Sequence, residues 1–185
     1  ETSGTMLLGS EIGAALTALE PLEIDAIGLN CGTGPTEMSE HLRHLSRHAR
    51  VPLVCMPNAG LPELTPEGAR YPMGPEEFVR YLEQYTAEFG LSLVGGCCGT
   101  TPAHISRLAA AVHGREPAPR DPVHVPAVSS LYAEVPLRQD TSYLSIGERT
   151  NANGSKAFRE AMLAENWADC LDIAKEQGRA GAHVL

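Results

Sequence analysis

The chain has 185 residues, of which 43% are hydrophobic and 5% aromatic, and its formal net charge is −9. That length allows one domain or two small ones, with a core built from aliphatic residues and alanine. The sequence contains no basic block, so the electrostatic footprint of nucleic-acid binding is missing. No apolar run approaches the roughly 20 residues of a membrane helix. We therefore expect neither a nucleic-acid partner nor a membrane span.

The cysteines indicate a reducing compartment. An odd number of them, an adjacent pair and no signal-peptide pattern argue against a disulfide framework and favour metal-binding or reactive thiols. We therefore expect a cytoplasmic protein. The chain does not begin with methionine and ends in the apolar run 182–185, so we expect both ends to lie within a longer protein. The five cysteines are Cys31, Cys55, Cys97, Cys98 and Cys170.

Residues 11–113 alternate between helix and strand patterns. The predicted helices cover 11–19, a segment capped by Thr36, a segment from Pro75 to Gly90, and a segment opened by Thr101 and Pro102. Apolar stripes at helical spacing predict their buried faces: Met38, Leu42, Leu45 and Ala49; Phe78, Leu82, Tyr85 and Phe89; Ile105, Leu108 and Val112. The predicted strands are 25–30, 51–56 and 91–94, with a loop over 58–74.

Four prolines between Gly114 and Pro126 mark a change in composition. Such a segment, without periodicity, is typical of a stiff linker between domains. After it the pattern begins again, with a strand at 143–146, a loop at 147–154, helices at about 155–164 and 167–177, and a further strand at 182–185. The predicted domains are therefore residues 1–113, a proline-rich linker over 114–140, and a truncated domain over 141–185.

Strand–helix units with continuously apolar strands predict an α/β fold with a parallel sheet covered by helices. An open doubly wound sheet and a closed barrel both fit this pattern. In either of them the carboxyl ends of the strands meet on one face, where active sites lie. Cys31, Asn58 and the pair Cys97–Cys98 each follow a predicted strand, so they should lie close together.

Three thiolates on one rim suit zinc, which binds sulfur in tetrahedral geometry. Three protein ligands leave a fourth position open, as in catalytic sites, and a substrate thiol in that position would lose its proton to the metal. Gly95, Gly96 and Gly99 would give the adjacent cysteines the backbone freedom to face one ion. The alternative is that Cys97 and Cys98 are small buried residues in a glycine turn. Cys55 and Cys170 are expected to be packing residues.

The segment Gly95-Gly96-Cys97-Cys98-Gly99-Thr100-Thr101-Pro102 resembles the zinc motif of the homocysteine methyltransferases, and residues 28–35 and 57–60 resemble two further segments of that family. The resemblance covers residues 1 to about 113 and implies the later part of a (β/α)8 TIM-type barrel. It implies that Cys31, Cys97 and Cys98 bind zinc, which activates homocysteine. Asn58 is similar to a position that contacts the substrate amino acid, although an asparagine in such a loop is often a turn residue.

The segment Ile146-Gly147-Glu148-Arg149-Thr150-Asn151, followed by Gly154-Ser155-Lys156, resembles the opening of the methyltetrahydrofolate-binding barrel of cobalamin-dependent methionine synthases. Betaine- and methylmethionine-dependent relatives lack that domain. The resemblance implies that Glu148 and Asn151 face the pterin ring. It also implies partners and cofactors of the full-length enzyme: homocysteine, methyltetrahydrofolate, and a cobalamin module that this sequence lacks.

The resemblance leaves three hypotheses. The first is a piece of a methyltransferase, with little or no turnover by itself, because neither barrel of about 250 residues closes within the chain. The second is a zinc-stabilised structural fragment without activity. The third is a betaine- or methylmethionine-type transferase, against which residues 146–156 argue. An incomplete barrel has unpaired strand edges, so we also expect self-association.

Overall fold

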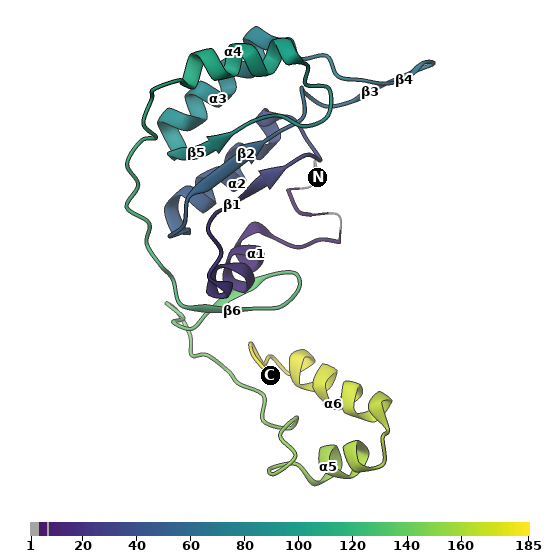
Figure 1. The fold of residues 1–185 in the computed structure, drawn as a ribbon. Coiled ribbons are helices and arrows are strands. Elements are labelled where there is room, and N and C mark those ends of the chain that lie inside the picture. Colours follow the sequence, from purple (N-terminus) through teal and green to yellow (C-terminus); the bar gives the residue numbers. More distant parts are fainter. Residues whose placement is uncertain (1–3, 7) are drawn as a thin grey trace. The chain divides into compact units, whose positions relative to one another are not determined.

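The computed structural model describes residues 4–6 and 8–185 (Figure 1). The chain divides into two compact units: Glu1–Val125 with Ser129–Glu134, and Pro126–Val128 with Val135–Leu185. Among the described residues, no helix is both long and apolar enough to cross a membrane.

A parallel three-stranded sheet forms the centre of the first unit. Its strands are β1 (Ile27–Asn30), β2 (Leu53–Met56) and β5 (Leu91–Val94), in the order β1-β2-β5. This confirms the predicted mixed α/β fold with a parallel sheet. The first two strands begin two residues later than predicted. Because all strands run in one direction, their carboxyl ends share one edge of the sheet (Figure 1).

Four α-helices of the first unit lie close to their predicted positions. They are α1 (Ile12–Leu19), α2 (Pro35–His48), α3 (Pro75–Phe89) and α4 (Pro102–Val112), and a short 3-10 helix (Glu20–Leu22) follows α1. The predicted stripes of α2 and α3 are buried, and Gly90 ends α3 in the left-handed conformation. The core joins these stripes to the sheet through Ile27, Leu53, Cys55 and Leu91.

Two details of the predicted helices are wrong. Helix α2 begins one residue before Thr36, with Gly34 as its N-cap and Pro35 in its first position, where a missing N–H costs nothing. In α4, Ile105 is 43% exposed, whereas the neighbouring His104 is buried. The His104 ring takes the inward position because both of its nitrogens find hydrogen-bond partners there. Nδ1 contacts the Thr101 hydroxyl, and Nε2 contacts the carbonyl of Met73.

Among the described residues of the first unit, helices cover one face of the sheet. Parallel neighbours joined by right-handed crossovers place α2 and α3 on the same face. Side chains that point to the opposite face are more open, and Leu93 is 53% exposed. Parallel sheets are normally buried on both faces. The first unit therefore presents an apolar sheet face without a cover among its described residues.

The predicted loop 58–74 contains a β-hairpin that the sequence pattern did not indicate. Strands β3 (Glu63–Thr65) and β4 (Gly68–Arg70) pair antiparallel, and nearly all of their residues are exposed. The hairpin projects from the body of the unit (Figure 1). Its second strand leads directly into the residues that contact the cysteine cluster.

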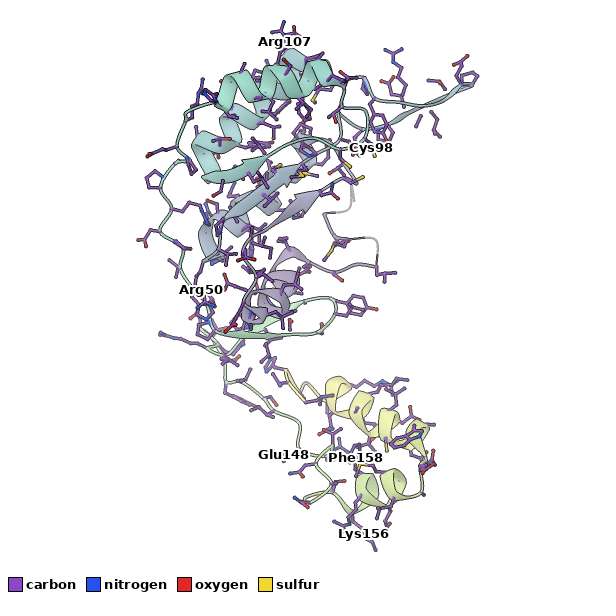
Figure 2. All side chains as sticks on the ribbon, viewed as in Figure 1. Arg50, Cys98, Arg107, Glu148, Lys156 and Phe158 are labelled. Atoms are coloured by element: carbon purple, nitrogen blue, oxygen red, sulfur yellow. The ribbon has the colours of Figure 1, made fainter. Side chains whose placement is uncertain are left out.

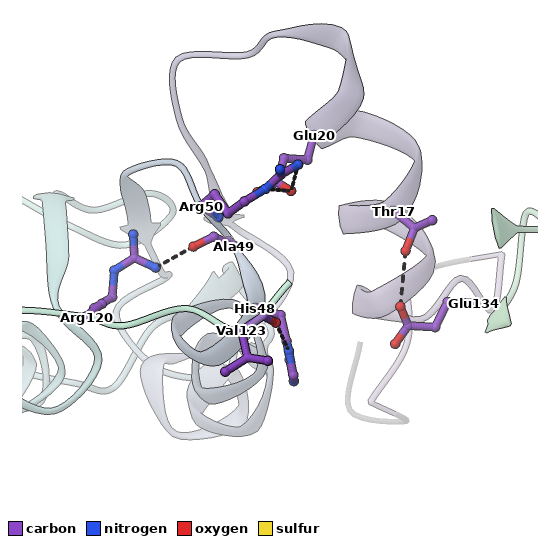
Figure 3. A network of polar contacts seen from close by, with 8 residues as sticks. All are labelled: Thr17, Glu20, His48, Ala49, Arg50, Arg120, Val123 and Glu134. Atoms are coloured by element: carbon purple, nitrogen blue, oxygen red, sulfur yellow. Dashed lines mark hydrogen bonds and ion pairs between the residues drawn. The ribbon is translucent and has the colours of Figure 1, made fainter. Parts of the chain in front are cut away.

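The proline-rich segment after α4 is held against the first unit by hydrogen bonds. The guanidinium of Arg120 donates to the carbonyls of Ala49 and Val51 at 2.9 and 2.7 Å. The amide of Val123 donates to Arg47 at 2.7 Å, and the carbonyl of Val123 lies 3.0 Å from Nδ1 of His48 (Figure 3). Residues 114–125, which we call the strap, are thus an ordered part of this unit. The prolines keep the strap extended, and its hydrogen bonds attach it to the unit.

The second unit contains two helices joined by a short turn. They are α5 (Lys156–Leu163), capped by Ser155, and α6 (Trp167–Arg179), capped by Asn166. Two short strands, β6 (Ala127–Ser129) and β7 (Glu134–Pro136), precede them within the predicted linker. The predicted strands at 143–146 and 182–185 are reduced to a single parallel bridge between Ile146 and Val184.

Candidate metal centre

Three cysteine sulfurs from two strand ends gather at the carboxyl edge of the sheet. The Sγ atoms of Cys31 and Cys98 are 3.6 Å apart, and those of Cys97 and Cys98 are 3.9 Å apart. All three atoms lie within 4.8 Å of one another. Figure 2 shows Cys98 beside the base of the β3–β4 hairpin. The structure therefore brings together the three residues that the sequence placed on one rim.

The spacing of these sulfurs fits one zinc ion. With zinc–sulfur bonds of about 2.3 Å and tetrahedral angles, neighbouring sulfurs lie about 3.8 Å apart. The two measured separations, 3.6 and 3.9 Å, bracket that value. A disulfide, by contrast, needs a bond of about 2.05 Å. The donor set and its spacing are thus those of a three-thiolate zinc site with one position left for a further ligand.

Cys31 is positioned by a turn at the end of β1. Its amide donates to the carbonyl of Met56 at 3.0 Å, which continues the β1–β2 pairing. Its φ of 62° is left-handed, a conformation that non-glycine residues rarely adopt. Such strain is held in place by surrounding structure and is concentrated at functional sites. Here it directs the Cys31 side chain toward the cysteine pair.

The cysteine pair is positioned by the segment that follows β2. The amide of Cys97 donates to the carbonyl of Pro57 at 2.9 Å, and the amide of Ala59 donates to the carbonyl of Cys98 at 2.9 Å. The hydroxyl of Thr100 closes the turn by donating to Cys97 at 2.7 Å. Backbone bonds on both sides of the pair therefore fix its distance from the ends of β1 and β2.

Of the three glycines beside the pair, only Gly99 has a left-handed φ, of 77°. The expectation that Gly95 and Gly96 also supply unusual backbone angles is wrong. Gly96 is needed for close packing instead, because an added Cβ would lie 2.4 Å from a methyl carbon of Thr100. At Gly99 an added Cβ would lie 2.3 Å from Tyr71, whose ring covers this residue.

Asn58 is buried behind the cysteines, with 3% of its surface exposed. Its side-chain Oδ1 accepts a hydrogen bond of 3.1 Å from the backbone amide of Cys98. Its backbone amide donates to the carbonyl of Thr33 at 3.0 Å. The Asn58 side chain also contributes to lowering the pKa of Cys31. It therefore connects the two parts of the cluster. The predicted contact between Asn58 and a substrate stays a prediction.

The surroundings favour the thiolate form of Cys31. A hydrogen bond from the backbone of Gly32 lowers the pKa of Cys31, and the thiols of Cys97 and Cys98 add to this effect. Cys97 behaves in the opposite way, because its hydrogen bond to Cys31 raises its own pKa. Burial raises the pKa of Cys55 to about 12, so this thiol is a packing residue, as predicted.

Two residues near the cluster were not singled out by sequence reasoning. Tyr71 lies over Gly99, and a hydrogen bond with Cys98 raises the pKa of Tyr71. His104 joins the start of α4 to Met73, and so fixes the segment that carries Tyr71. The capping position of His104 could be read from the sequence, as the third residue after Thr101. Nothing in the sequence pattern indicated Tyr71.

A cavity of about 320 Å³ lies beside Cys31. Apolar side chains line most of it, including Ile12, Leu29 and Met38. The cysteines themselves are accessible, with Cys31 and Cys97 partly exposed and Cys98 exposed. A thiol compound could therefore reach the open position of the cluster.

The other predicted site residues lie in the second unit. Glu148 and Asn151 are exposed, and Nδ2 of Asn151 donates to Oε2 of Glu148 at 3.3 Å. The amide of Asn151 also donates to the Glu148 carbonyl at 3.1 Å, which closes a turn between them. The structure thus brings these two side chains together. Their predicted role toward a pterin is not tested by this contact.

Residues 1–112 match the family described as homocysteine S-methyltransferase. This match covers more than half of the chain and contains all three clustered cysteines. The chain belongs to the homocysteine S-methyltransferase family. That membership implies that the parallel sheet is part of a TIM-type barrel, which resolves the choice between an open sheet and a barrel.

Two relatives are similar to this chain along its whole length. A protein named methionine synthase from Mycobacterium tuberculosis (strain ATCC 25618 / H37Rv) is 67% identical over 185 residues. A protein of the same name from Mycobacterium leprae (strain TN) is 65% identical over 190 residues. Each alignment covers 100% of this chain and 16% of the relative. The chain therefore spans about a sixth of the length of these relatives.

Proposed function

We propose that Cys31, Cys97 and Cys98 hold a zinc ion that binds homocysteine through its sulfur. The observation that carries this proposal is the clustering of the three sulfurs: two of their separations, 3.6 and 3.9 Å, match the edges of a zinc–thiolate tetrahedron, all three lie within 4.8 Å, and one corner is left open. Bound zinc would supply Lewis acidity that keeps the homocysteine thiol deprotonated at neutral pH. The thiolate is the nucleophilic form of a thiol.

The chain's own residues prepare this site in two ways. The Gly32 amide lowers the pKa of Cys31 and so favours the thiolate, which is the form of cysteine that binds a metal. The buried Asn58 holds the amide of Cys98 and thereby limits the movement of the cysteine pair. We propose that Asn58 also contributes to the recognition of the homocysteine amino acid group.

For the complete protein we propose the activity of a cobalamin-dependent methionine synthase. Homocysteine would receive a methyl group from methylcobalamin and become methionine, and methyltetrahydrofolate would recharge the cobalamin. High identity to two proteins of that name along all 185 residues supports this choice over a betaine- or methylmethionine-type enzyme. We place the enzyme in the cytoplasm, where free thiols stay reduced.

We propose that the second unit opens the methyltetrahydrofolate-binding barrel. The proposed limits are residues 1–113 for the homocysteine part, 114–140 for the linker and 141–185 for the folate part. Glu148 and Asn151 would contact the pterin ring, whose edge offers donors and acceptors to a carboxylate and an amide. Their mutual hydrogen bond supports this role, because it presets both side chains.

The first experiment measures zinc per chain in the wild type, in Cys98→Ala and in the matched control Cys170→Ala. We expect one zinc in the wild type and in the control, and a loss of zinc in Cys98→Ala. Cys170 is the right control because it lies in α6, outside the cluster. Reduced wild-type protein that binds no zinc would contradict the proposal.

A second measurement separates a catalytic site from a structural one. Cobalt(II) replaces zinc and reports each thiolate ligand by its charge-transfer absorption. Homocysteine should increase this absorption in the wild type because it adds a fourth sulfur. An unchanged spectrum at saturating homocysteine would mean a closed structural site, and the chain would then be a zinc-stabilised fragment without a role in homocysteine binding.

A further inference from the structure

Gln177 is the one residue of the second unit with a buried polar side chain among those described. It lies in α6 and is 4% exposed. Its Oε1 accepts a hydrogen bond of 2.6 Å from the amide of Arg149, the residue directly after Glu148. Its Nε2 is buried and has no partner among the described residues. Glutamines are mostly exposed, so this placement calls for a reason.

The backbone around Gly147 fits closely against this side chain. A Cβ added at Gly147 would lie 2.7 Å from Oε1 of Gln177 and 2.6 Å from a methyl carbon of Leu185. The amide of Gly147 donates to the carbonyl of Val184 at 2.7 Å. The residues on both sides of Glu148 are therefore anchored, one by the chain's final segment and the other by Gln177.

Packing alone does not account for a glutamine at this position. A methionine would fill a similar volume without burying a donor that lacks a partner, and a buried unpaired donor is unfavourable. The bond that the glutamine side chain does make is to the Arg149 amide. The geometry therefore assigns the function of the side chain to its acceptor, Oε1.

We propose that Gln177 is a positioning residue for the pterin-binding turn: by fixing the backbone at Arg149 it holds Glu148 and Asn151 in the arrangement that receives the ligand. This inference rests on the proposed role of Glu148 and Asn151. The Asn151 side chain already donates to Glu148, so a turn that is fixed at Arg149 presents both groups together. Residues held by packing and outer hydrogen bonds make better sites than free ones.

The test uses a complete methionine synthase that carries this chain, with the substitutions Gln177→Met and Gln177→Glu. Methionine removes the acceptor and keeps the size, whereas glutamate keeps the acceptor oxygen and replaces Nε2 by a second carboxyl oxygen. We expect Gln177→Met to weaken methyltetrahydrofolate binding about 10- to 100-fold, because small displacements of binding groups have effects of that size. Gln177→Glu should bind within about threefold of wild type.

Two further readouts distinguish positioning from general destabilisation. Hydrogen exchange of the Arg149 amide should accelerate in Gln177→Met and stay slow in Gln177→Glu. Methyl transfer from methylcobalamin to homocysteine should be unchanged in both variants, because it depends on the cysteine cluster in the other unit. Should Gln177→Met lose overall folding, Gly147→Ala tests the same anchor from the opposite side, since its Cβ would displace Oε1.

The outcomes separate this inference from the proposed function. Wild-type binding of methyltetrahydrofolate together with wild-type affinity in Gln177→Met would overturn the inference alone. Equal losses in Gln177→Met and Gln177→Glu would also overturn it, because the acceptor would then not be the group that matters. A wild-type enzyme that binds no methyltetrahydrofolate would instead refute the proposed folate site.

Discussion

At the scale of single residues, the metal centre depends on groups that carry no chemistry of their own. Asn58 is buried and bonds the Cys98 amide, and Gly99 leaves room for Tyr71. Cys31 adopts a strained backbone conformation that brings its sulfur to the pair. The ligand set is therefore only part of the site. Neighbouring residues that are not ligands fix the positions of the three sulfur atoms.

Asn58→Ala tests the role of the buried amide. The Cys98 amide would lose its acceptor, so the free energy of unfolding should fall by about 1–3 kcal/mol. Zinc affinity should fall about 10- to 100-fold, as is typical when an outer partner of a metal site is removed. Urea unfolding and competition with a chelator measure the two effects. Thr36→Ala is the control, because Thr36 is exposed and does not cap α2, and a change above about 0.5 kcal/mol there would count against this account.

Gly99→Ala and Gly32→Ala form a matched pair beside the cluster. Both glycines have a left-handed φ, of 77° and 75°, but an added Cβ meets Tyr71 at Gly99 and nothing within 4 Å at Gly32. Both substitutions should therefore cost about 1 kcal/mol from backbone strain. Gly99→Ala should cost about 1–3 kcal/mol more, since Tyr71 must move.

Denaturant unfolding curves give the difference between the two glycine variants. The double variants with Tyr71→Gly show its origin, because the Cβ and Cγ of Tyr71 both lie 2.3 Å from the added Cβ and removing the whole side chain should relieve most of the extra cost at Gly99 and none at Gly32. Equal costs in the two single variants would mean that Tyr71 moves aside freely and does not cover the cysteine pair.

At the scale of elements, the strap contributes to the first unit instead of only leading away from it. Arg120 is half-buried and bonds two carbonyls, at the end of α2 and before β2. The Val123 backbone adds hydrogen bonds to the last turn of α2, through the Arg47 carbonyl and the His48 ring (Figure 3). Proline-rich composition predicted the extended form of this segment but not its attachment.

Arg120→Ala should lower the free energy of unfolding of the first unit by about 1–3 kcal/mol, because two carbonyls lose a charged donor. Arg115→Ala serves as the control within the same strap. Arg115 makes an exposed ion pair of 2.9 Å with Glu83, which should be worth at most about 1 kcal/mol. Thermal unfolding of both variants compares them directly, and equal effects would show that the strap is held by its prolines and not by Arg120.

At the scale of the whole molecule, the sheet of the first unit has unpaired outer edges and an uncovered face among the described residues. Strands β1 and β5 each pair on one side only among the described residues, and Leu93 lies open on the uncovered face. Unpaired strand edges and apolar faces promote association. In the complete barrel that the family implies, the strand edges would be paired and the apolar face would be covered.

The isolated chain should therefore associate with itself at micromolar concentrations, which light scattering would detect. Leu93→Lys adds a charge to the open face and should shift the distribution toward the monomer. Ile105→Lys, at a position on α4 that is also exposed, is the control and should have no such effect. A wild-type chain that stays monomeric throughout would contradict this prediction.

The sequence by itself determined the order of the four α-helices and the three parallel strands in the first unit and the convergence of the cysteines. Apolar stripes and glycine or proline boundaries are local signals, and the geometry of parallel strands then places Cys31, Cys97 and Cys98 on one edge. Only the tertiary structure decided the hairpin at 63–70, the inward position of His104, the attachment of the strap, and the contacts of Tyr71 and Gln177. The hairpin pairs residues that are close in sequence, but its exposed strands carry no apolar alternation that would mark them as strands. Each of the other features depends on a partner far along the chain, which no local pattern encodes, because the two partners come together only when the chain folds.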